Sequence, residues 1–373
     1  MARGGAPRIF IGAGEPSGDL HAAGVVAALL QRFPGATIEA FGGPRMAAAG
    51  ATVRHPMERY TVLGFIEVLG KIPAHWRLLR ALEAEFRQGR YDLVVLVDYP
   101  GFHLRVAEAA RRAGVPVLYY IAPQLWAWRP GRARRFARAV DALAVVLPFE
   151  PEFFARSGLP AEYVGHPLTD RDWPSRDAAR AALGIEPGQR VLGIFPGSRG
   201  QELRRLWPAF RDAAERLLAE GTCDRAVAAA TASGDYPGAG RVEVWRGDPL
   251  AVFAAADAAL AKSGTTTLEA ALAGVPMVVA YRVQRLSGWL ARHLVTVPWI
   301  SLVNLVAGRG VVPELVQGAV TAERLAAEVA PLLDPHGEAA AAQRAGLAVV
   351  RERLGGPGAA TRVAAIASRL LGS

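Results

Sequence analysis

The sequence predicts an α/β protein of two Rossmann-like domains that face each other across a cleft. Short apolar β-type runs alternate with Ala-rich helical patterns, and this alternation restarts halfway along the chain. The 373 residues, 51% of them hydrophobic, are enough for two domains that each bury a core. We place the domains at 1–168 and 169–345, and expect a terminal segment at 346–373 that can cross back to the first domain.

The expected strands are the short apolar runs. In the first half they lie at 9–13, 37–41, 93–98, 117–121, 142–146 and 161–164, and the segments between them, such as 20–32 and 104–113, have helical spacing. After a Gly-, Pro- and Asp-containing stretch at 165–177, further strands are expected at 191–195, 225–229, 242–245, 258–261 and 277–280. Because parallel sheets bind ligands at the carboxyl ends of their strands, functional residues are expected in the loops that follow them.

Composition excludes several classes of protein. A single cysteine, Cys223, cannot build a disulfide framework or a metal cluster, and the sequence shows neither a signal peptide nor an apolar stretch long enough to span a bilayer. We therefore expect a cytoplasmic protein. The net charge of +9 is nearly all arginine, and the arginine run at 129–138 has no RNA-binding signature beside it, so we expect no nucleic-acid partner. That run is either a solvated helix face or an anion site.

The loop after the first expected strand is a candidate for sugar contact. Its third glycine comes one residue too late for a dinucleotide fingerprint, and Pro16 occupies the turn. Glycines allow close approach of a sugar, whereas a tight turn with a helix cap is the alternative. The residues assigned to acceptor contact here are Gly14, Glu15, Ser17, Gly18 and Asp19.

Two loops of the second half predict a nucleoside diphosphate site. Each follows a strand and opens a helix, so that backbone amides converge on an anion, and the second ends in a carboxylate suited to ribose hydroxyls. The assigned residues are Gly197, Ser198 and Arg199 in one loop, and Ser263, Gly264, Thr265, Thr266 and Glu269 in the other. Asp170 and Asp172 have an acid-x-acid spacing but no preceding strand, so we expect no metal and no cofactor.

The motifs, in their order along the chain, resemble those of lipid-A-disaccharide synthases. They are GEPSGD at 14–19, GGPRM at 42–46, VLGF at 62–65, WAWR at 126–129, LPFE at 147–150, GH at 165–166, PGSR at 196–199 and SGT at 263–265. The resemblance implies an inverting, metal-independent glycosyltransferase of the B-type fold. It implies that UDP-2,3-diacylglucosamine and 2,3-diacylglucosamine 1-phosphate are joined through a β-1,6 bond with release of UDP. Another UDP-N-acetylglucosamine-using enzyme of this fold, a peptidoglycan glycosyltransferase or a 2-epimerase, is the alternative.

Such a transfer needs a base for the proton of the acceptor 6-hydroxyl. Asp98 ends an apolar strand at the carboxyl edge, and the family has a functional aspartate at this motif, so we assign the base to Asp98. Capping of the helix near Phe102 is its structural alternative. Glu15, Asp19 and His103 are the other candidates.

Two further side chains are assigned to ligands. Trp128 is expected at a sugar or an interface, with core packing as the alternative. Asn304 is expected to contact the nucleotide, with a hydrogen-bonded turn as the alternative, and Arg282 is considered in the same way.

A membrane contact is expected because both implied substrates are acylated. A helix rich in large apolar residues with basic residues after it suits a lipid headgroup region, whereas core packing is the alternative. We predict peripheral binding to the cytoplasmic face of the inner membrane, and a homo-oligomer is compatible with the sequence. The membrane-contact residues are Val62, Leu63, Phe65, Ile66, Val68 and Leu69.

Overall fold

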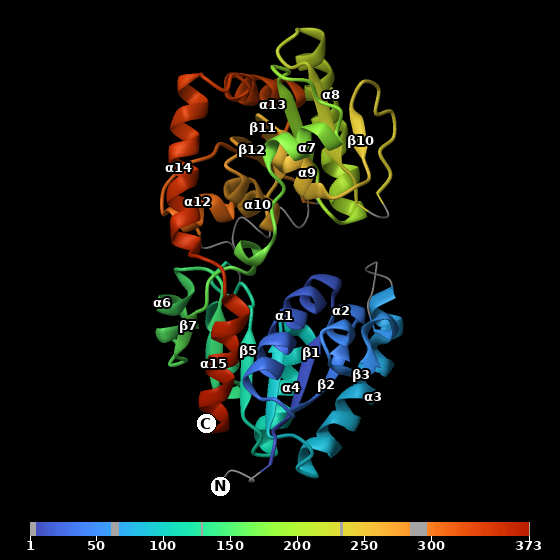
Figure 1. Cartoon of the computed structure of the whole chain (residues 1–373), viewed down its shortest axis with the longest axis vertical. Helices are drawn as coiled ribbons and strands as arrows, with labels where there is room; N and C mark the ends of the chain where they lie inside the picture. Colours follow the sequence, from blue (N-terminus) through green and yellow to red (C-terminus); the bar gives the residue numbers. More distant parts are fainter. Residues whose placement is uncertain (1–4, 61–66, 128–129, 232–233, 284–296, 373) are drawn as a thin grey trace. The chain divides into compact units, whose positions relative to one another are not determined.

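The computed structural model describes residues 5–60, 67–127, 130–231, 234–283 and 297–372, and of residues 67–71 and 130 it describes the backbone alone (Figure 1). The chain divides into two compact units, unit 1 comprising Met1–Asp170 with Gly356–Ser373 and unit 2 comprising Arg171–Gly355. The predicted fold class is confirmed, because each unit is a parallel sheet covered by helices. The expected terminal segment differs in its start: a helix, Glu338–Leu354, runs through residue 346, so the segment that returns to unit 1 begins at Gly356.

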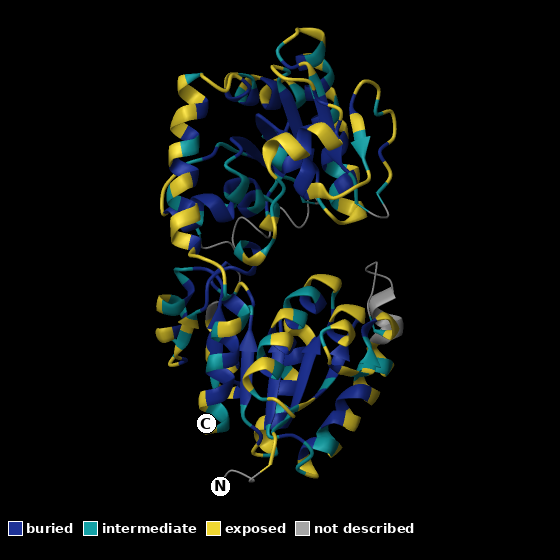
Figure 2. Ribbon diagram, in the orientation of Figure 1, coloured by how far each residue is buried: buried dark blue, intermediate teal, exposed yellow. Residues whose placement is uncertain are grey.

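In the described part of unit 1 the strands form one parallel sheet in the order β3-β2-β1-β4-β5-β6-β7. The central strands are buried on both faces, which explains their continuous apolar sequences (Figure 2). The bounds are β1 Arg8–Ala13, β2 Thr37–Gly42, β3 Thr52–Pro56, β4 Leu93–Val97, β5 Val117–Tyr120, β6 Ala142–Val145 and β7 Ala161–Tyr163.

Helices pack against the sheet of unit 1 in two groups. α1 contacts α2 and α15, while α4 contacts α3 and α5 and buries apolar side chains against Phe10, Val94 and Leu96 of the sheet. The C-terminal α15 is attached to unit 1 at its start, where the backbone N–H of Gly358 donates to Asp170. The bounds are α1 Pro16–Arg32, α2 Pro44–Ala48, α3 Glu67–Arg87, α4 Pro100–Arg112, α5 Ala133–Ala139, α6 Glu150–Ala155 and α15 Ala359–Leu371.

Unit 2 repeats this plan, with the described strands in the order β10-β9-β8-β11-β12-β13. α8 and α13 pack together, while α10 contacts α9, α12 and α14. The strands are β8 Val191–Phe195, β9 Arg225–Ala229, β10 Glu243–Trp245, β11 Ala258–Lys262, β12 Met277–Tyr281 and β13 Glu314–Val316. The helices are α7 Arg176–Ala182, α8 Gly200–Ala219, α9 Pro249–Ala255, α10 Thr265–Ala273, α12 Leu302–Ala307, α13 Ala322–Val329 and α14 Glu338–Leu354.

Both strand orders reverse direction at one point, between β1 and β4 in unit 1 and between β8 and β11 in unit 2. The carboxyl ends of neighbouring strands diverge into loops there, and open α/β sheets bind their ligands at this switch point. Each unit therefore offers one principal place for a site. Among the described helices none is long and apolar enough to span a bilayer.

Candidate active site

Asp98 lies at the switch point of unit 1. It follows β4 directly, and β4 pairs with β1 so that Val97 is level with Ala13. The loop that begins at Gly14 therefore leaves the sheet beside Asp98, and the structure brings together the expected base and the start of the expected acceptor loop. The N-cap of α4 is Tyr99, so Asp98 does not hold the capping position that was its structural alternative.

The backbone at Asp98 has an uncommon conformation. Asp98 and Tyr99 have φ values of 50° and 54°, in the left-handed region that residues other than glycine rarely adopt. The carbonyl oxygen of Asp98 accepts hydrogen bonds from the Tyr119 hydroxyl and from Nδ1 of His103, each at 2.6 Å. Strained backbone of this kind persists where its surroundings hold it, and it is concentrated at functional sites.

His103 is a neutral donor in this arrangement. It is completely buried, and burial lowers its pKa to about 4 against the opposing effect of hydrogen bonds to the backbone at Asp98 and Val97. Since Nδ1 faces a carbonyl oxygen, the proton of the neutral ring lies on Nδ1. The sequence made His103 an alternative catalytic group, whereas the structure places it beneath the backbone of Asp98.

Gly14 is required by a close approach to Tyr99. A Cβ atom at Gly14 would lie 2.4 Å from a ring carbon of Tyr99, so no larger residue fits while the ring keeps its place. The Tyr99 hydroxyl is in turn 2.9 Å from Nε2 of His75 on α3. The first loop, the Asp98 segment and α3 thus form one packed assembly within unit 1.

The other residues of the first loop have separate environments. Glu15 is the half-buried N-cap residue of α1, Ser17 is exposed and Gly18 is buried. Asp19 is buried, and its carboxylate accepts hydrogen bonds from the backbone N–H groups of Gly43, Arg45 and Met46 at 2.8 to 3.3 Å. Asp19 therefore caps α2, not the helix on which it lies, and its carboxylate is committed to that task.

Several predicted contacts lie outside the described residues or side chains. Trp128, Val62, Leu63, Phe65 and Ile66 are not described, and of Val68 and Leu69 only the helical backbone is. The neighbouring Trp126 is buried, and its indole N–H donates to Glu150 at 3.0 Å, which corresponds to the core-packing alternative for this motif.

In unit 2 the two predicted loops meet at the switch point, because β8 and β11 are adjacent. Gly197 has a φ of 117°, and Ser198 and Arg199 are exposed. Glu202, the third residue of α8, accepts hydrogen bonds from the N–H groups of Ser198 at 3.1 Å and Arg199 at 3.3 Å. Its other oxygen is 3.0 Å from Nζ of Lys262, the last residue of β11.

The third loop opens α10 with small hydroxyl residues. The Ser263 hydroxyl donates to the carbonyl of Ile300 at 2.8 Å, and the Thr267 hydroxyl donates to that of Gly264 at the same distance. Thr265 is exposed and Thr266 is half-buried, so these two hydroxyls are the accessible ones in the loop.

Glu269 follows on the second turn of α10. Its carboxylate accepts from Arg171 at 2.5 Å, and burial raises its pKa although the Arg171 charge acts in the opposite direction. The sequence indicated Glu269 but not Arg171, because a distant ion-pair partner leaves no trace in local spacing.

Asn304 and Arg282 have the structural roles that were their alternatives. The Asn304 amide donates to the Val312 carbonyl and to Glu314, and its oxygen accepts from two backbone N–H groups, so the buried side chain is fully hydrogen-bonded inside unit 2. Arg282 donates to three backbone carbonyls. Asn304 thereby ties α12 to the stretch that leads into β13, and Arg282 ties the end of β12 to residues 317 and 320.

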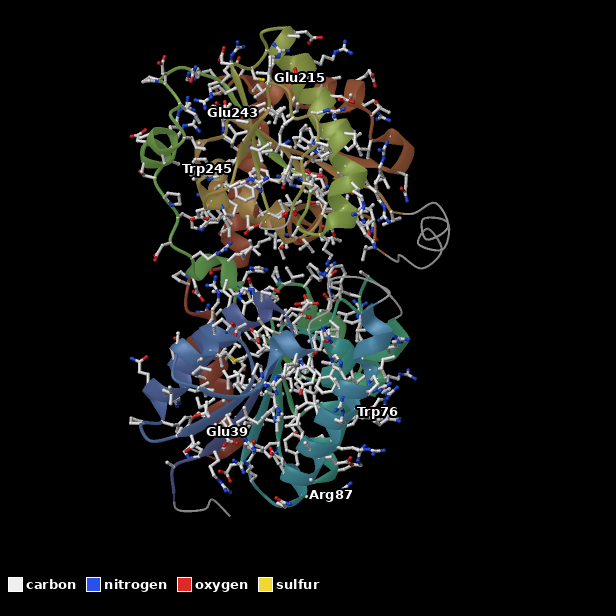
Figure 3. All side chains as sticks on the ribbon, turned by 90° about the vertical axis from the view of Figure 1, so that its right-hand side faces the viewer. Glu39, Trp76, Arg87, Glu215, Glu243 and Trp245 are labelled. Carbon is white, nitrogen blue, oxygen red and sulfur yellow. The ribbon has the colours of Figure 1, made fainter. Side chains whose placement is uncertain are left out.

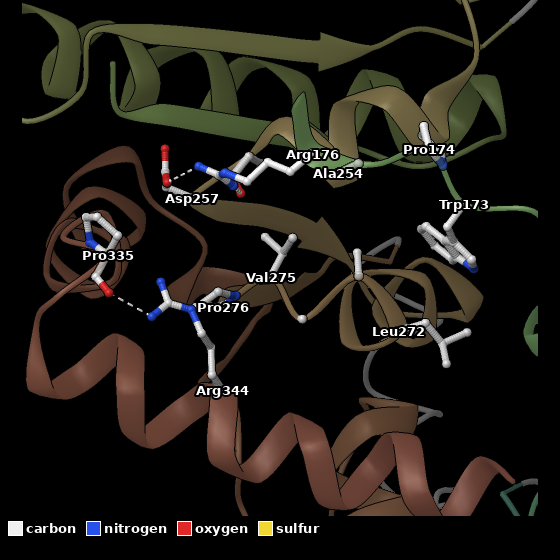
Figure 4. Close-up of a pocket in the computed structure, with 13 residues that line it drawn as sticks. Trp173, Pro174, Arg176, Ala254, Asp257, Leu272, Val275, Pro276, Pro335 and Arg344 are labelled. Atoms are coloured by element: carbon white, nitrogen blue, oxygen red, sulfur yellow. Dashed lines mark hydrogen bonds and ion pairs between the residues drawn. The ribbon is translucent and has the colours of Figure 1, made fainter. Parts of the chain in front are cut away.

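A cavity of about 480 Å³ lies elsewhere in unit 2, near the amino ends of β11 and β12 (Figure 4). Arg176 and Arg344 approach it from α7 and α14, with Trp173 and Leu272 farther along its wall. Arg176 is paired with Asp257 at 2.6 Å, and Arg344 donates to a carbonyl at 2.9 Å. Since parallel sheets bind ligands at the opposite edge, the candidate site remains at the two loops.

Comparisons with known proteins show the family of this chain. The model of the lipid-A-disaccharide synthetase family matches residues 9–355. The lipid-A-disaccharide synthase of Geobacter sulfurreducens is 42% identical over 379 residues, covering 98% of this chain and 97% of the relative. That of Anaeromyxobacter sp. (strain K) is 44% identical over 374 residues, covering 96% of each.

Solved structures share the fold at low sequence identity. A putative UDP-N-acetylglucosamine 2-epimerase from Listeria monocytogenes has a TM-score of 0.67 at 13% identity, covering 98% of this chain and 97% of that one. The glycotransferase of kitacinnamycin has a TM-score of 0.64 at 21% identity, with 98% and 99% covered. At these identities the likeness shows the fold alone.

Proposed function

This chain belongs to the lipid-A-disaccharide synthase family and is a glycosyltransferase, and from that premise we propose its substrates and the residues that act on them. The donor is UDP-2,3-diacylglucosamine and the acceptor is 2,3-diacylglucosamine 1-phosphate. The products are the β-1,6-linked disaccharide 1-phosphate and UDP.

Unit 2 holds the donor at its switch point. Arg199 is exposed beside the amides that begin α8, and the accessible hydroxyls of Thr265 and Thr266 begin α10. Helix N-termini and a guanidinium together favour a diphosphate, because both place donors and positive charge toward it. Glu269, oriented by Arg171, accepts from the ribose hydroxyls.

Unit 1 supplies the base. The Asp98 carboxylate takes the proton of the acceptor 6-hydroxyl as the hydroxyl oxygen forms a bond to the anomeric carbon of the donor. The bond from that carbon to the diphosphate breaks on the opposite face, so the configuration inverts and UDP leaves with the electron pair. The observation that carries this assignment is the left-handed backbone of Asp98, held at the switch point by two buried donors.

The acylated substrates are met at the membrane surface through α3. Ile72 and Trp76 are the large hydrophobic residues that are exposed among those the structure describes, at 43% and 46%, and their spacing of four places them on one side of the helix. Trp76 is labelled in Figure 3. Arg77 and Arg80 are exposed nearby, so an apolar patch lies beside positive charge. This combination supports peripheral binding to anionic lipid on the cytoplasmic face of the inner membrane.

The test is a reaction with defined substrates. Purified protein is mixed with UDP-2,3-diacylglucosamine and 2,3-diacylglucosamine 1-phosphate, and UDP release and disaccharide mass are followed with and without a chelator. We expect stoichiometric UDP and disaccharide, unchanged by the chelator. Turnover of unacylated UDP-N-acetylglucosamine alone would contradict the proposal and favour another enzyme of this fold.

A further inference from the structure

The loop before α8, Gly197 to Arg199, binds the carboxylate of Glu202. Both N–H groups that precede α8, those of Ser198 and Arg199, donate to one oxygen of Glu202. The left-handed Gly197 closes over the same carboxylate, because a Cβ there would lie 2.6 Å from that oxygen. The loop is therefore folded around a carboxylate in the position where a phosphate oxygen is expected to bind.

The second oxygen of Glu202 joins this loop to the other one. It pairs with Lys262 at 3.0 Å, and the two side chains are 17% and 19% exposed. Lys262 immediately precedes the loop Ser263 to Thr266, and its Nζ lies 3.4 Å from where a Cβ of Gly264 would be. The ammonium thus stands between the two loops that would hold the donor's diphosphate.

Helix capping accounts for only part of this arrangement. A glutamate at the third position of a helix often accepts from the N-cap amide, which explains the bond to Arg199. Capping does not require a half-buried lysine on β11, the neighbouring strand of the sheet. Lysine is also rare in this chain, which has 43 basic residues but lysine only at positions 71 and 262. A compact ammonium can transfer from one oxyanion to another more freely than a forked guanidinium.

The charge of Glu202 determines how it competes with a bound diphosphate. Burial raises the pKa of Glu202, but the Lys262 charge, its hydrogen bond and the loop amides together leave it below its usual range. Glu202 is therefore anionic at neutral pH and competes with a diphosphate for the same donors. A diphosphate carries more negative charge than one carboxylate, so it is the stronger partner for Lys262 and the amides.

We propose that Lys262 is a ligand of the donor diphosphate, held in the absence of donor by Glu202, which acts as an internal stand-in for a phosphate. On donor binding the ammonium passes from Glu202 to the diphosphate, and it then stabilises the negative charge that develops on the leaving UDP. This inference rests on the proposed donor site of unit 2.

The experiment measures UDP affinity by calorimetry and turnover with the acylated substrates. Lys262→Met is expected to weaken UDP binding about tenfold, the scale of one charge-assisted hydrogen bond, and to lower kcat without changing the KM for acceptor. Glu202→Gln is expected to tighten UDP binding severalfold, because the competing charge is gone. Glu323→Gln, at a comparable position in the first turn of α13, is the matched control and should leave UDP affinity unchanged.

The direction of the change in UDP affinity distinguishes the possible outcomes. If Glu202 is only a cap, Glu202→Gln weakens UDP binding or leaves it unchanged, and the inference is overturned. Lys262→Arg addresses misfolding: it keeps the charge on a less adaptable group, so an affinity for UDP clearly above that of Lys262→Met supports the inference, whereas loss equal to that of Lys262→Met opposes it. If UDP binds and Arg199→Ala weakens it while Lys262→Met has no effect, the exchange fails and the donor site stands. If the unaltered protein does not bind UDP, the proposed function itself fails.

Discussion

Gly14→Ala tests whether the packing beneath Asp98 controls turnover. The added Cβ would lie 2.4 to 2.6 Å from three atoms of the Tyr99 ring, where carbon atoms ordinarily approach to about 3.5 Å or more. The ring must therefore shift by about 1 Å, and Tyr99 is joined directly to Asp98. A misplacement of about 1 Å can cost about 100-fold in rate.

We expect Gly14→Ala to lower kcat by roughly 100-fold, equivalent to about 2.7 kcal/mol of activation free energy. Overpacking should also lower the free energy of unfolding by about 1 to 3 kcal/mol. UDP affinity, a property of unit 2, should not change. The assays are UDP release under saturating acylated substrates, calorimetry with UDP, and thermal unfolding.

Gly101→Ala is the matched control, because nothing lies within 4 Å of a Cβ at that position. It should retain the kcat of the unaltered protein. Turnover of Gly14→Ala at the rate of Gly101→Ala, or an equal loss of UDP affinity, would show that the packing beneath Asp98 does not control turnover.

Three further outcomes are expected. Tyr119→Phe removes one of two donors to the Asp98 carbonyl, so kcat should fall about fivefold, the scale of about 1 kcal/mol, with UDP affinity unchanged; an equal loss of UDP affinity would contradict this. The pKa of Glu39 is lowered to about 2, chiefly by its hydrogen bond to Arg90. Glu39 therefore contributes up to about 3 kcal/mol to the free energy of unfolding above pH 4.5, and this contribution is lost as the pH falls toward 2. Glu39→Gln should flatten that part of the curve of stability against pH, and an unchanged slope would contradict the assignment. Trp76→Ser should reduce sedimentation with anionic vesicles severalfold without shifting thermal unfolding, whereas Trp245→Ser on unit 2 should not; a collapse of the thermal transition would favour core packing for α3.

The strands could be predicted from the sequence where burial requires a continuous run of apolar residues. The predicted strands that proved correct within one or two residues, such as β4 and β8, are apolar along their length because helices cover both faces. The unpredicted β3 and β13 are edge strands with half-exposed residues, so their sequences have neither a continuous apolar run nor clear alternation.

The loops that form the candidate site could be predicted from the sequence, but the residues that pair with them could not. Motif spacing and strand ends indicate Asp98 and the loop at Arg199, because both depend on local sequence. The hydrogen bond from Tyr119 to the Asp98 carbonyl and the ion pair of Glu202 with Lys262 join residues far apart in the chain, and no local pattern encodes them. The interpretation of Asn304 as a nucleotide contact met the same limit, since the groups that its amide binds lie on the following loop and strand.

Whether Asp98 is the base is tested by comparing Asp98→Asn with the unaltered protein in single-turnover reactions with both acylated substrates. We expect Asp98→Asn to bind UDP with the same affinity and to form almost no disaccharide, since an amide cannot accept the proton of the 6-hydroxyl. Disaccharide formation by Asp98→Asn at a rate close to that of the unaltered protein would contradict this assignment.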